Sequence, residues 1–165
     1  MNTYERFQKM KIDFACLGIQ QLEHYENHYC TPKDAVIIGS TGVDGIHYCT
    51  IPEFGEMIFA VNPMDFGDCV HPIARNFGDL LRLLLSCADM AVLEQCYAWD
   101  EEEYKAWLID CPATKKQAQA LAAIQAEFGL EPMEDAFAYV KQLQAEFDLS
   151  KIPYTEDFYD IDMNP

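Results

Sequence analysis

The chain has 165 residues, of which half are apolar and 24% are charged, a composition typical of globular rather than disordered proteins. Its 28 acidic and 11 basic residues give a formal net charge of −17. A charge of this size repels phosphate backbones and anionic membranes, which argues against a nucleic-acid-binding protein, and it attracts basic surfaces at long range.

The cysteines and the apolar segments indicate the compartment. Seven cysteines without a repeated short spacing do not fit a secreted disulfide framework. Residues 1–10 lack the apolar stretch of a secretion signal. The most apolar segment, 80–93, is interrupted by charges and is shorter than the ~20 residues that span a bilayer. We therefore expect a cytoplasmic protein with free thiols and no membrane partner.

The N-terminal part predicts a helix. Tyr4, Phe7 and Met10 have helical spacing. Residues 13–19 are compatible with a helix or a strand, and we favour the helix.

Three apolar runs, at 36–40, 45–51 and 57–61, predict an antiparallel meander. The pair Asp44-Gly45 between the first two runs suits the positive φ angles of a tight hairpin turn. In the third run both sets of alternate residues are apolar. We therefore expect both faces of the sheet to be covered, mainly by helices.

Helices are predicted in the second half of the chain. Asn76 has the features of an N-cap opening a helix over 77–87, whose leucines form a broad apolar stripe. Capping-box spacing and a first-turn proline predict three further helix starts, at Asp100 with Glu103, at Thr114 with Gln117, and at Pro132. Residues 152–165 form an acidic, aromatic tail.

These elements predict an α+β fold, with an antiparallel β-sheet (meander) flanked by helices and a C-terminal helical extension. We place an α+β domain at 1–110 and assign 111–165 to a helical extension and acidic tail, packed on or beside that domain.

His24, His28 and Cys30 are of the residue types that bind zinc. On a helix the two histidines would share one face. Glu26 would point away from that face, so the arrangement of a zinc protease is absent. Surface or core-edge histidines are the favoured interpretation, and a metal site stays open as an alternative.

Two cysteine–histidine pairs, His47 with Cys49 and Cys69 with His71, would each share one side of a strand. No third residue that would orient a catalytic base is evident, so we favour core packing. The glycine-rich segment 39–45 has no Lys and no following helix to receive a phosphate, which leaves turn formation as its role. We predict neither an enzyme nor a cofactor.

Acidic residues gather in the predicted loops. Most loop carboxylates serve only solvation, and a paired-carboxylate hydrolase would need two of them inside a cleft. As contacts for a basic partner, however, they are our candidate site residues: Asp44, Glu53, Glu56, Asp65 and Asp68.

The runs 34–49, 54–63 and 70–85, which read DAVIIGSTGVDGIHYC, FGEMIFAVNP and VHPIARNFGDLLRLLL, resemble bacterial members of the SUKH superfamily (Smi/Knr-type). The resemblance covers about residues 1–110. It implies an antiparallel sheet flanked by helices. Many bacterial relatives are immunity proteins that bind and neutralise cognate toxins, often nucleases, and no catalytic residues accompany that role.

The resulting hypothesis is an immunity protein that occludes the surface of a basic toxin. Two alternatives stay open: a metal-binding protein or enzyme built on His24, His28 and Cys30, and a regulatory scaffold without a toxin partner. The sequence does not identify the toxin, the binding footprint, the oligomeric state or the role of the C-terminal helices.

Overall fold

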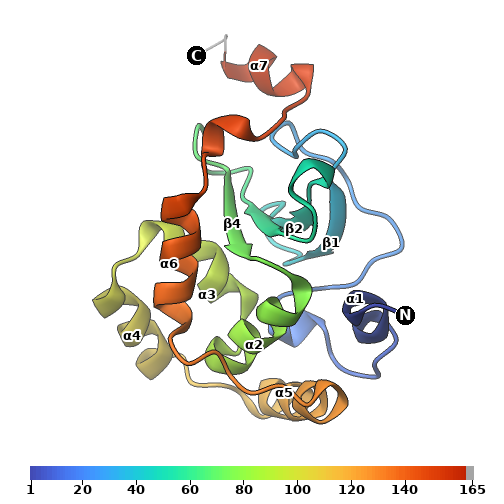
Figure 1. Ribbon diagram of the computed structural model, residues 1–165, viewed down its shortest axis with the longest axis vertical. Coiled ribbons are helices and arrows are strands. Elements are labelled where there is room, and N and C mark those ends of the chain that lie inside the picture. Colours follow the sequence, from blue (N-terminus) through green and yellow to red (C-terminus); the bar gives the residue numbers. More distant parts are fainter. Residues whose placement is uncertain (163–165) are drawn as a thin grey trace.

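The structure, a computed structural model, describes residues 1–162 and has the α+β fold that the sequence predicts (Figure 1). Four strands form one antiparallel sheet in the order β1-β2-β3-β4, with β1 at Val36–Ser40, β2 at His47–Thr50, β3 at Ile58–Val61 and β4 at Val70–Ala74. The α-helices are α1 (Thr3–Gln8), α2 (Phe77–Cys87), α3 (Met90–Gln95), α4 (Glu101–Asp110), α5 (Lys115–Phe128), α6 (Ala136–Glu146) and α7 (Glu156–Asp162). Short 3-10 helices lie at Ala15–Leu17, Pro52–Phe54, Cys96–Ala98 and Leu149–Lys151.

The strand register places two loops together. Ser40 is paired with His47, His47 with Val61, and Val61 with Val70, so these residues lie in one row across the sheet. The β1–β2 loop (41–46) and the β3–β4 loop (62–69) therefore leave the sheet at the same end, which we call the two-loop end. The β2–β3 loop (51–57) lies at the opposite end.

Strand β4 extends the predicted meander by one strand. The sequence did not indicate this strand, because it contains Pro72. Proline cannot donate a ladder hydrogen bond and is therefore rare inside strands. The proline is tolerated because β4 is an edge strand and the register shifts between Ile58 and Phe59, beside it. Helix α6 covers this edge, where Gln144 Nε2 donates to the Pro72 carbonyl at 3.2 Å.

Residues 13–28 correct the N-terminal prediction. Only Ala15–Leu17 is helical, as a 3-10 turn, and Gln20 then pairs with Ser40 at the outer edge of β1. Leu17 and Ile19 are both fully buried, a two-residue period that favours an extended chain over a helix. Farther along the same edge, Gln21 Nε2 and the Tyr4 hydroxyl donate to the Ile38 carbonyl. The edge of β1 is thus partly occupied.

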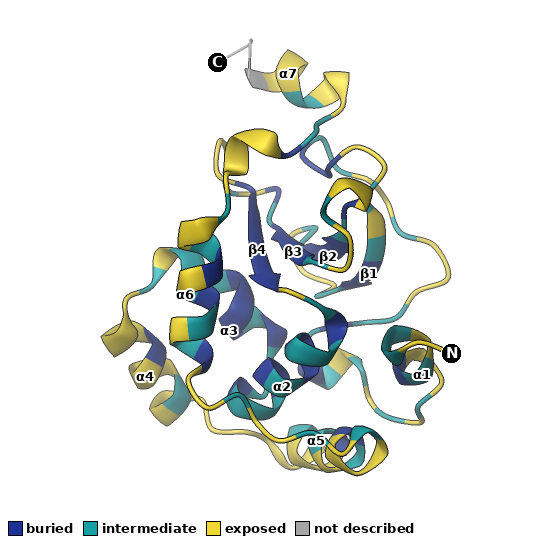
Figure 2. Ribbon diagram, viewed as in Figure 1, coloured by how far each residue is buried: buried dark blue, intermediate teal, exposed yellow. Residues whose placement is uncertain are grey.

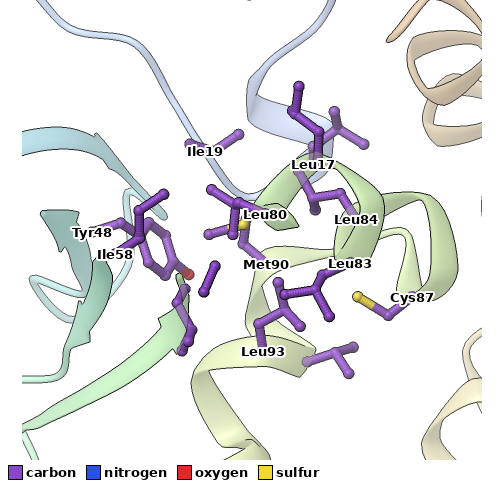
Figure 3. Close-up of a cluster of buried hydrophobic side chains, with 14 of the residues drawn as sticks. Leu17, Ile19, Tyr48, Ile58, Leu80, Leu83, Leu84, Cys87, Met90 and Leu93 are labelled. Carbon is purple, nitrogen blue, oxygen red and sulfur yellow. The ribbon is translucent and has the colours of Figure 1, made fainter. Parts of the chain in front are cut away.

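Helix α2 covers one face of the sheet, as expected. Asn76 caps it, accepting a hydrogen bond from the Asp79 amide at 2.8 Å, which confirms the predicted start. The leucines of α2 pack against Ile58 and Tyr48 of the sheet and against Leu17 and Ile19 (Figure 3). A short helix that the sequence did not indicate, α3, follows after Ala88 turns the chain at a φ of 68°.

The opposite face carries a second apolar cluster, and helices do not supply most of its cover. Segment 29–35 and the chain after α6 lie over it, with Phe147, Ile152 and Tyr154 packed against the sheet. The cluster has eight buried members: Cys30, Cys49, Ile51, Phe59, Val61, Cys69, Val70 and Ile152. The sheet is therefore buried on both faces, as the apolar alternation predicts, and its strands are mostly dark blue in Figure 2.

The C-terminal helices add to the first cluster. Ile124 of α5 and Val140 of α6 are fully buried in it. The predicted caps at Asp100 and Thr114 are confirmed. The start predicted at Pro132 is wrong, because α6 begins at Ala136, capped by Asp135.

The linker before α6 explains that error. The Met133 amide donates to the Arg82 carbonyl, and Ser86 Oγ donates to the Met133 carbonyl. These bonds hold the linker along α2, so that α6 begins only at Ala136. Within the described range 1–162, no helix combines the length and apolarity needed to cross a membrane.

Tyr48 has a buried hydroxyl that finds no hydrogen-bond partner among the described residues. We expect Tyr48→Phe to stabilise the fold by about 1 kcal/mol, because it removes an unpaired polar group from the core. Urea unfolding measures the change. Tyr4→Phe is the control, since the Tyr4 hydroxyl is hydrogen-bonded and its removal should destabilise. A Tyr48→Phe variant less stable than wild type would contradict the assignment.

Candidate partner-binding surface

The β3–β4 loop at the two-loop end is held by its own hydrogen bonds. The Asn62 amide donates to the Cys69 carbonyl at 2.8 Å and closes the base of the loop. The Met64 amide donates to Asn62 Oδ1, and the Asp68 amide donates to the Asp65 carbonyl, both at 3.0 Å. The backbone of the loop is therefore set before any partner arrives.

This loop exposes two large apolar side chains next to two carboxylates. Met64 is 63% exposed and Phe66 69%. Asp65 and Asp68 alternate with them along the chain. A single exposed apolar residue is ordinary on a protein surface. Two such residues on one ordered loop form a better candidate for a contact with another protein.

The stacked rings of His71 and Tyr97 hold the two loop carboxylates in place. The Tyr97 hydroxyl donates to Asp65 Oδ2. Nε2 of His71 lies 3.0 Å from Asp68 Oδ1, and the His71 and Tyr97 rings are stacked with centroids 4.0 Å apart. Residues of β4 and of the 3-10 helix Cys96–Ala98 thus fix the positions of the two loop carboxylates.

Glu94 of α3 holds the base of the loop. Asn62 Nδ2 donates to Glu94 Oε1 at 2.9 Å, and Gln95 Nε2 donates to the other carboxylate oxygen. Glu94 is only 3% exposed, and burial raises the pKa of its carboxyl group. A buried carboxylate at this position ties the loop to the first apolar cluster.

A row of stacked rings connects the loop to α7. Phe66 stacks on Tyr29 with centroids 5.6 Å apart, Tyr29 stacks on Phe158, and Phe158 stacks on Tyr154. The Tyr29 hydroxyl donates to the Pro63 carbonyl at 3.0 Å, which anchors the row to the loop. Figure 1 shows α7 projecting at the end of the molecule opposite α5.

We call the resulting surface the aromatic–acidic surface. It combines exposed apolar side chains with carboxylates from two segments that are distant in sequence. Its members are Met64, Asp65, Phe66 and Asp68 of the loop and Glu156, Asp157 and Tyr159 of α7.

The structure divides the five acidic residues predicted as contacts. Asp65 and Asp68 lie together in the β3–β4 loop, and Asp44 lies in the exposed turn at the same end of the sheet. Glu53 and Glu56 are exposed at the opposite end. Met64, Phe66 and α7 were not among the contacts predicted from the sequence. Apolar residues inside an acidic loop were the signal that could have identified the first two.

The metal-site alternative loses its geometric premise. Residues 24–28 are not helical, so His24 and His28 do not share a helical face. His28 instead stacks on His47 with centroids 5.6 Å apart, and Cys30 is buried in the second apolar cluster. In residues 1–162, no three His, Cys, Asp or Glu side chains are grouped so as to hold a metal ion.

The cysteine–histidine pairs have other partners. His47 interacts with Thr31 Oγ1 at 3.1 Å and with the Gly45 carbonyl, and burial lowers its pKa. Burial raises the pKa of the Cys49 thiol to about 12. His71 contacts Tyr97 and Asp68, as described above, while the Cys69 thiol contacts Tyr29 at 3.3 Å.

The predicted turn at Asp44-Gly45 is present, and both residues have positive φ. A Cβ atom at Gly45 would lie 2.6 Å from the His28 ring, so the position requires glycine for close approach as well as for its φ. The glycine-rich segment thus serves chain packing.

No family model, no curated protein and no solved structure matches the chain.

Glu94 gives stability a distinct pH dependence. Because its pKa is raised in the folded state, folding takes up a proton between the ordinary carboxyl pKa and the raised one, and stability falls as pH rises through that window. We expect the unfolding free energy of wild type, minus that of Glu94→Gln, to decrease from pH 5 to 7.5. This range lies above the isoelectric point of about 4.3.

Urea unfolding at each pH measures this difference, with Glu56→Gln as a control at an exposed position. If the unfolding free energy of wild type minus that of Glu94→Gln instead increases with pH, the fold stabilises the ionised Glu94 carboxylate and the prediction is wrong.

Proposed function

We propose that this chain is a cytoplasmic immunity protein of the SUKH type, which neutralises a basic toxin such as a nuclease by occluding its surface. The observation that carries the proposal is the ordered β3–β4 loop, which presents Met64 and Phe66 beside two carboxylates, Asp65 and Asp68. The resemblance of residues 34–85 to SUKH proteins supports it independently. In this role the chain carries out no catalysis and binds neither cofactor nor nucleic acid.

The net charge of −17 supports a basic partner. Nucleases are positively charged where they hold phosphates, so an acidic inhibitor is attracted to the surface that it must block. Electrostatic steering of this kind raises association rates toward about 10⁸ M⁻¹s⁻¹ at low salt. Salt screens the attraction, and the effect should weaken as ionic strength rises.

Affinity requires more than charge. Aromatic and aliphatic anchors that enter pockets on a partner supply most binding energy at protein interfaces, while rim charges mainly change the association rate. Phe66 and Met64 are suited to this role because their loop is already hydrogen-bonded in place. Little conformational entropy is lost when a preorganised loop binds.

The experiment is co-purification of the tagged chain with the product of its neighbouring gene, repeated at rising salt. We expect a complex that associates more slowly as salt rises. Asp44→Asn with Asp68→Asn should slow association at low salt several-fold. The matched control, Glu53→Gln with Glu56→Gln, removes the same charge from the opposite end and should have a smaller effect.

Absence of a complex, or an isolated gene without a toxin-like neighbour, would count against immunity. An association rate that does not change with ionic strength would contradict the role of electrostatic attraction. Turnover of a small substrate, lost on replacing one cysteine or histidine, would favour an enzyme instead.

Phe66→Ala tests the anchor. We expect the complex to dissociate about 30-fold faster, since truncating a central aromatic anchor typically costs about 2 kcal/mol. Surface plasmon resonance on the purified complex measures the rate. Val36→Ala is the control, because Val36 is also exposed but lies at the opposite end of the sheet. Equal effects of the two variants would place the interface elsewhere.

A further inference from the structure

The two tryptophans of the chain lie together, away from both apolar faces of the sheet. Trp99 follows the 3-10 helix Cys96–Ala98, and Trp107 belongs to α4. Their ring centroids are 5.4 Å apart, and the rings are tilted by 37°. Trp99 is half-buried and Trp107 is 36% exposed. Accessible tryptophans are enriched at binding sites, so this pair is a candidate for one.

Helix α4 holds Trp107 in place. Tyr104, one turn earlier on the helix, is buried, and its ring packs on Phe137 of α6 with centroids 5.2 Å apart. Asp100 and Glu103 form a capping box that fixes the first turn. The indole is therefore carried by ordered backbone, and little conformational entropy is lost when a ligand binds to it.

A pocket of about 470 Å³ is lined by both tryptophans. This volume lies within the range of about 300–1,000 Å³ that is usual for ligand pockets. Val43 of the β1–β2 loop also lines the pocket and is 60% exposed, which places this loop at the mouth. Two carboxylates, Asp89 and Glu94, belong to the lining as well. Among the described residues that line the pocket, none is Lys, Arg or His.

Aromatic rings beside carboxylates are suited to an organic cation. The face of an indole attracts a cation that lies within about 6 Å of the ring centroid. Asp89 adds a hydrogen-bond acceptor: its two oxygens each accept one bond, from the Ala91 amide and from Gln117 Nε2, and each has a second lone pair. A guanidinium group fits these features better than an ammonium group, because it is planar, stacks on aromatic faces and is weakly hydrated.

The pocket adjoins the aromatic–acidic surface. Glu94 lines the pocket and also accepts the hydrogen bond from Asn62 at the base of the β3–β4 loop. The β1–β2 loop, which contributes Val43, leaves the sheet at the two-loop end. A protein that binds the aromatic–acidic surface therefore lies next to the pocket, and the net charge of −17 favours a basic one.

We propose that the pocket lined by Trp99 and Trp107 binds the guanidinium group of an arginine side chain that a partner protein supplies. The guanidinium stacks on the indole rings and donates to Asp89. The choice of a partner's side chain as the occupant rests on the proposed function. The affinity of the pocket for guanidinium does not, and it is tested on the purified chain alone.

The probe is Nα-acetyl-arginine methylamide, titrated into the ¹⁵N-labelled chain. Because the chain has two tryptophans, its NMR spectrum contains two indole N–H signals, and Trp99→Phe assigns them. We expect both signals to shift and to saturate. The citrulline analogue, which is neutral but has nearly the same shape, should shift them little, and the lysine analogue should bind more weakly. No saturable shift, or equal binding of either analogue, would overturn the proposal.

Variants of the pocket locate the site. Trp107→Ala should weaken binding of the probe about 5-fold, as expected for loss of a cation–π contact. Tyr159→Ala is the matched control, since Tyr159 is an exposed aromatic residue on the acidic helix α7, and it should leave binding unchanged. Val43→Lys places a positive charge at the mouth and should weaken binding more than Val43→Gln, which has a similar length without the charge. Loss of binding in Tyr159→Ala instead would place the cation elsewhere.

Two measurements test the occupant. In the complex of the proposed function, Trp107→Ala should speed dissociation about 5-fold. An unchanged dissociation rate would overturn the partner side chain as the occupant. Free arginine that binds more tightly than the blocked probe would do the same, because it would indicate a site for a small molecule. If the probe binds but no complex forms, the proposed function fails and the guanidinium site stands.

Discussion

The fold depends on a four-stranded sheet that is apolar on both faces. Water must be excluded from each face, and a chain of this length has few elements with which to do it. The leucines of α2 close one face. Segment 29–35 and the chain after α6 close the other. Because that second cover comes from two distant stretches, it brings Tyr29, the β3–β4 loop and α7 to the same end. The candidate surface is thus a consequence of how the second face is buried.

The strong negative charge is arranged so that the fold tolerates it. Four ion pairs join side chains among residues 1–162, and three of them involve an exposed Arg or Lys, so they add little to stability. Among the residues whose burial is described, Glu94 is the one buried carboxylate, and Asn62 and Gln95 hydrogen-bond to it. The other acidic side chains there are partly or fully exposed, where like charge costs self-repulsion. Apolar burial therefore carries the stability of the fold.

Local signals predicted local structure well. The caps at Asn76, Asp100 and Thr114, and the turn at Asp44-Gly45, follow from side chains that bond to their own backbone neighbourhood. The failures all involve distant contacts. Pro132 resembles a helix start, but α2 binds the chain beside it. His24 and His28 resemble a ligand pair, but residues 20–21 are bound to the sheet edge. The acidic residues looked alike in sequence, and only the strand register separated Asp65 and Asp68 from Glu53 and Glu56.

Both edges of the sheet are partly occupied by the chain itself. Gln20, Gln21 and Tyr4 hydrogen-bond to the outer side of β1. At β4, Gln144 donates to the carbonyl of Pro72, which has no amide hydrogen of its own. An unpaired strand margin is a template on which further copies can assemble into fibrils. Where the chain bonds to its own edge strands, those backbone groups are no longer open to pairing with another copy.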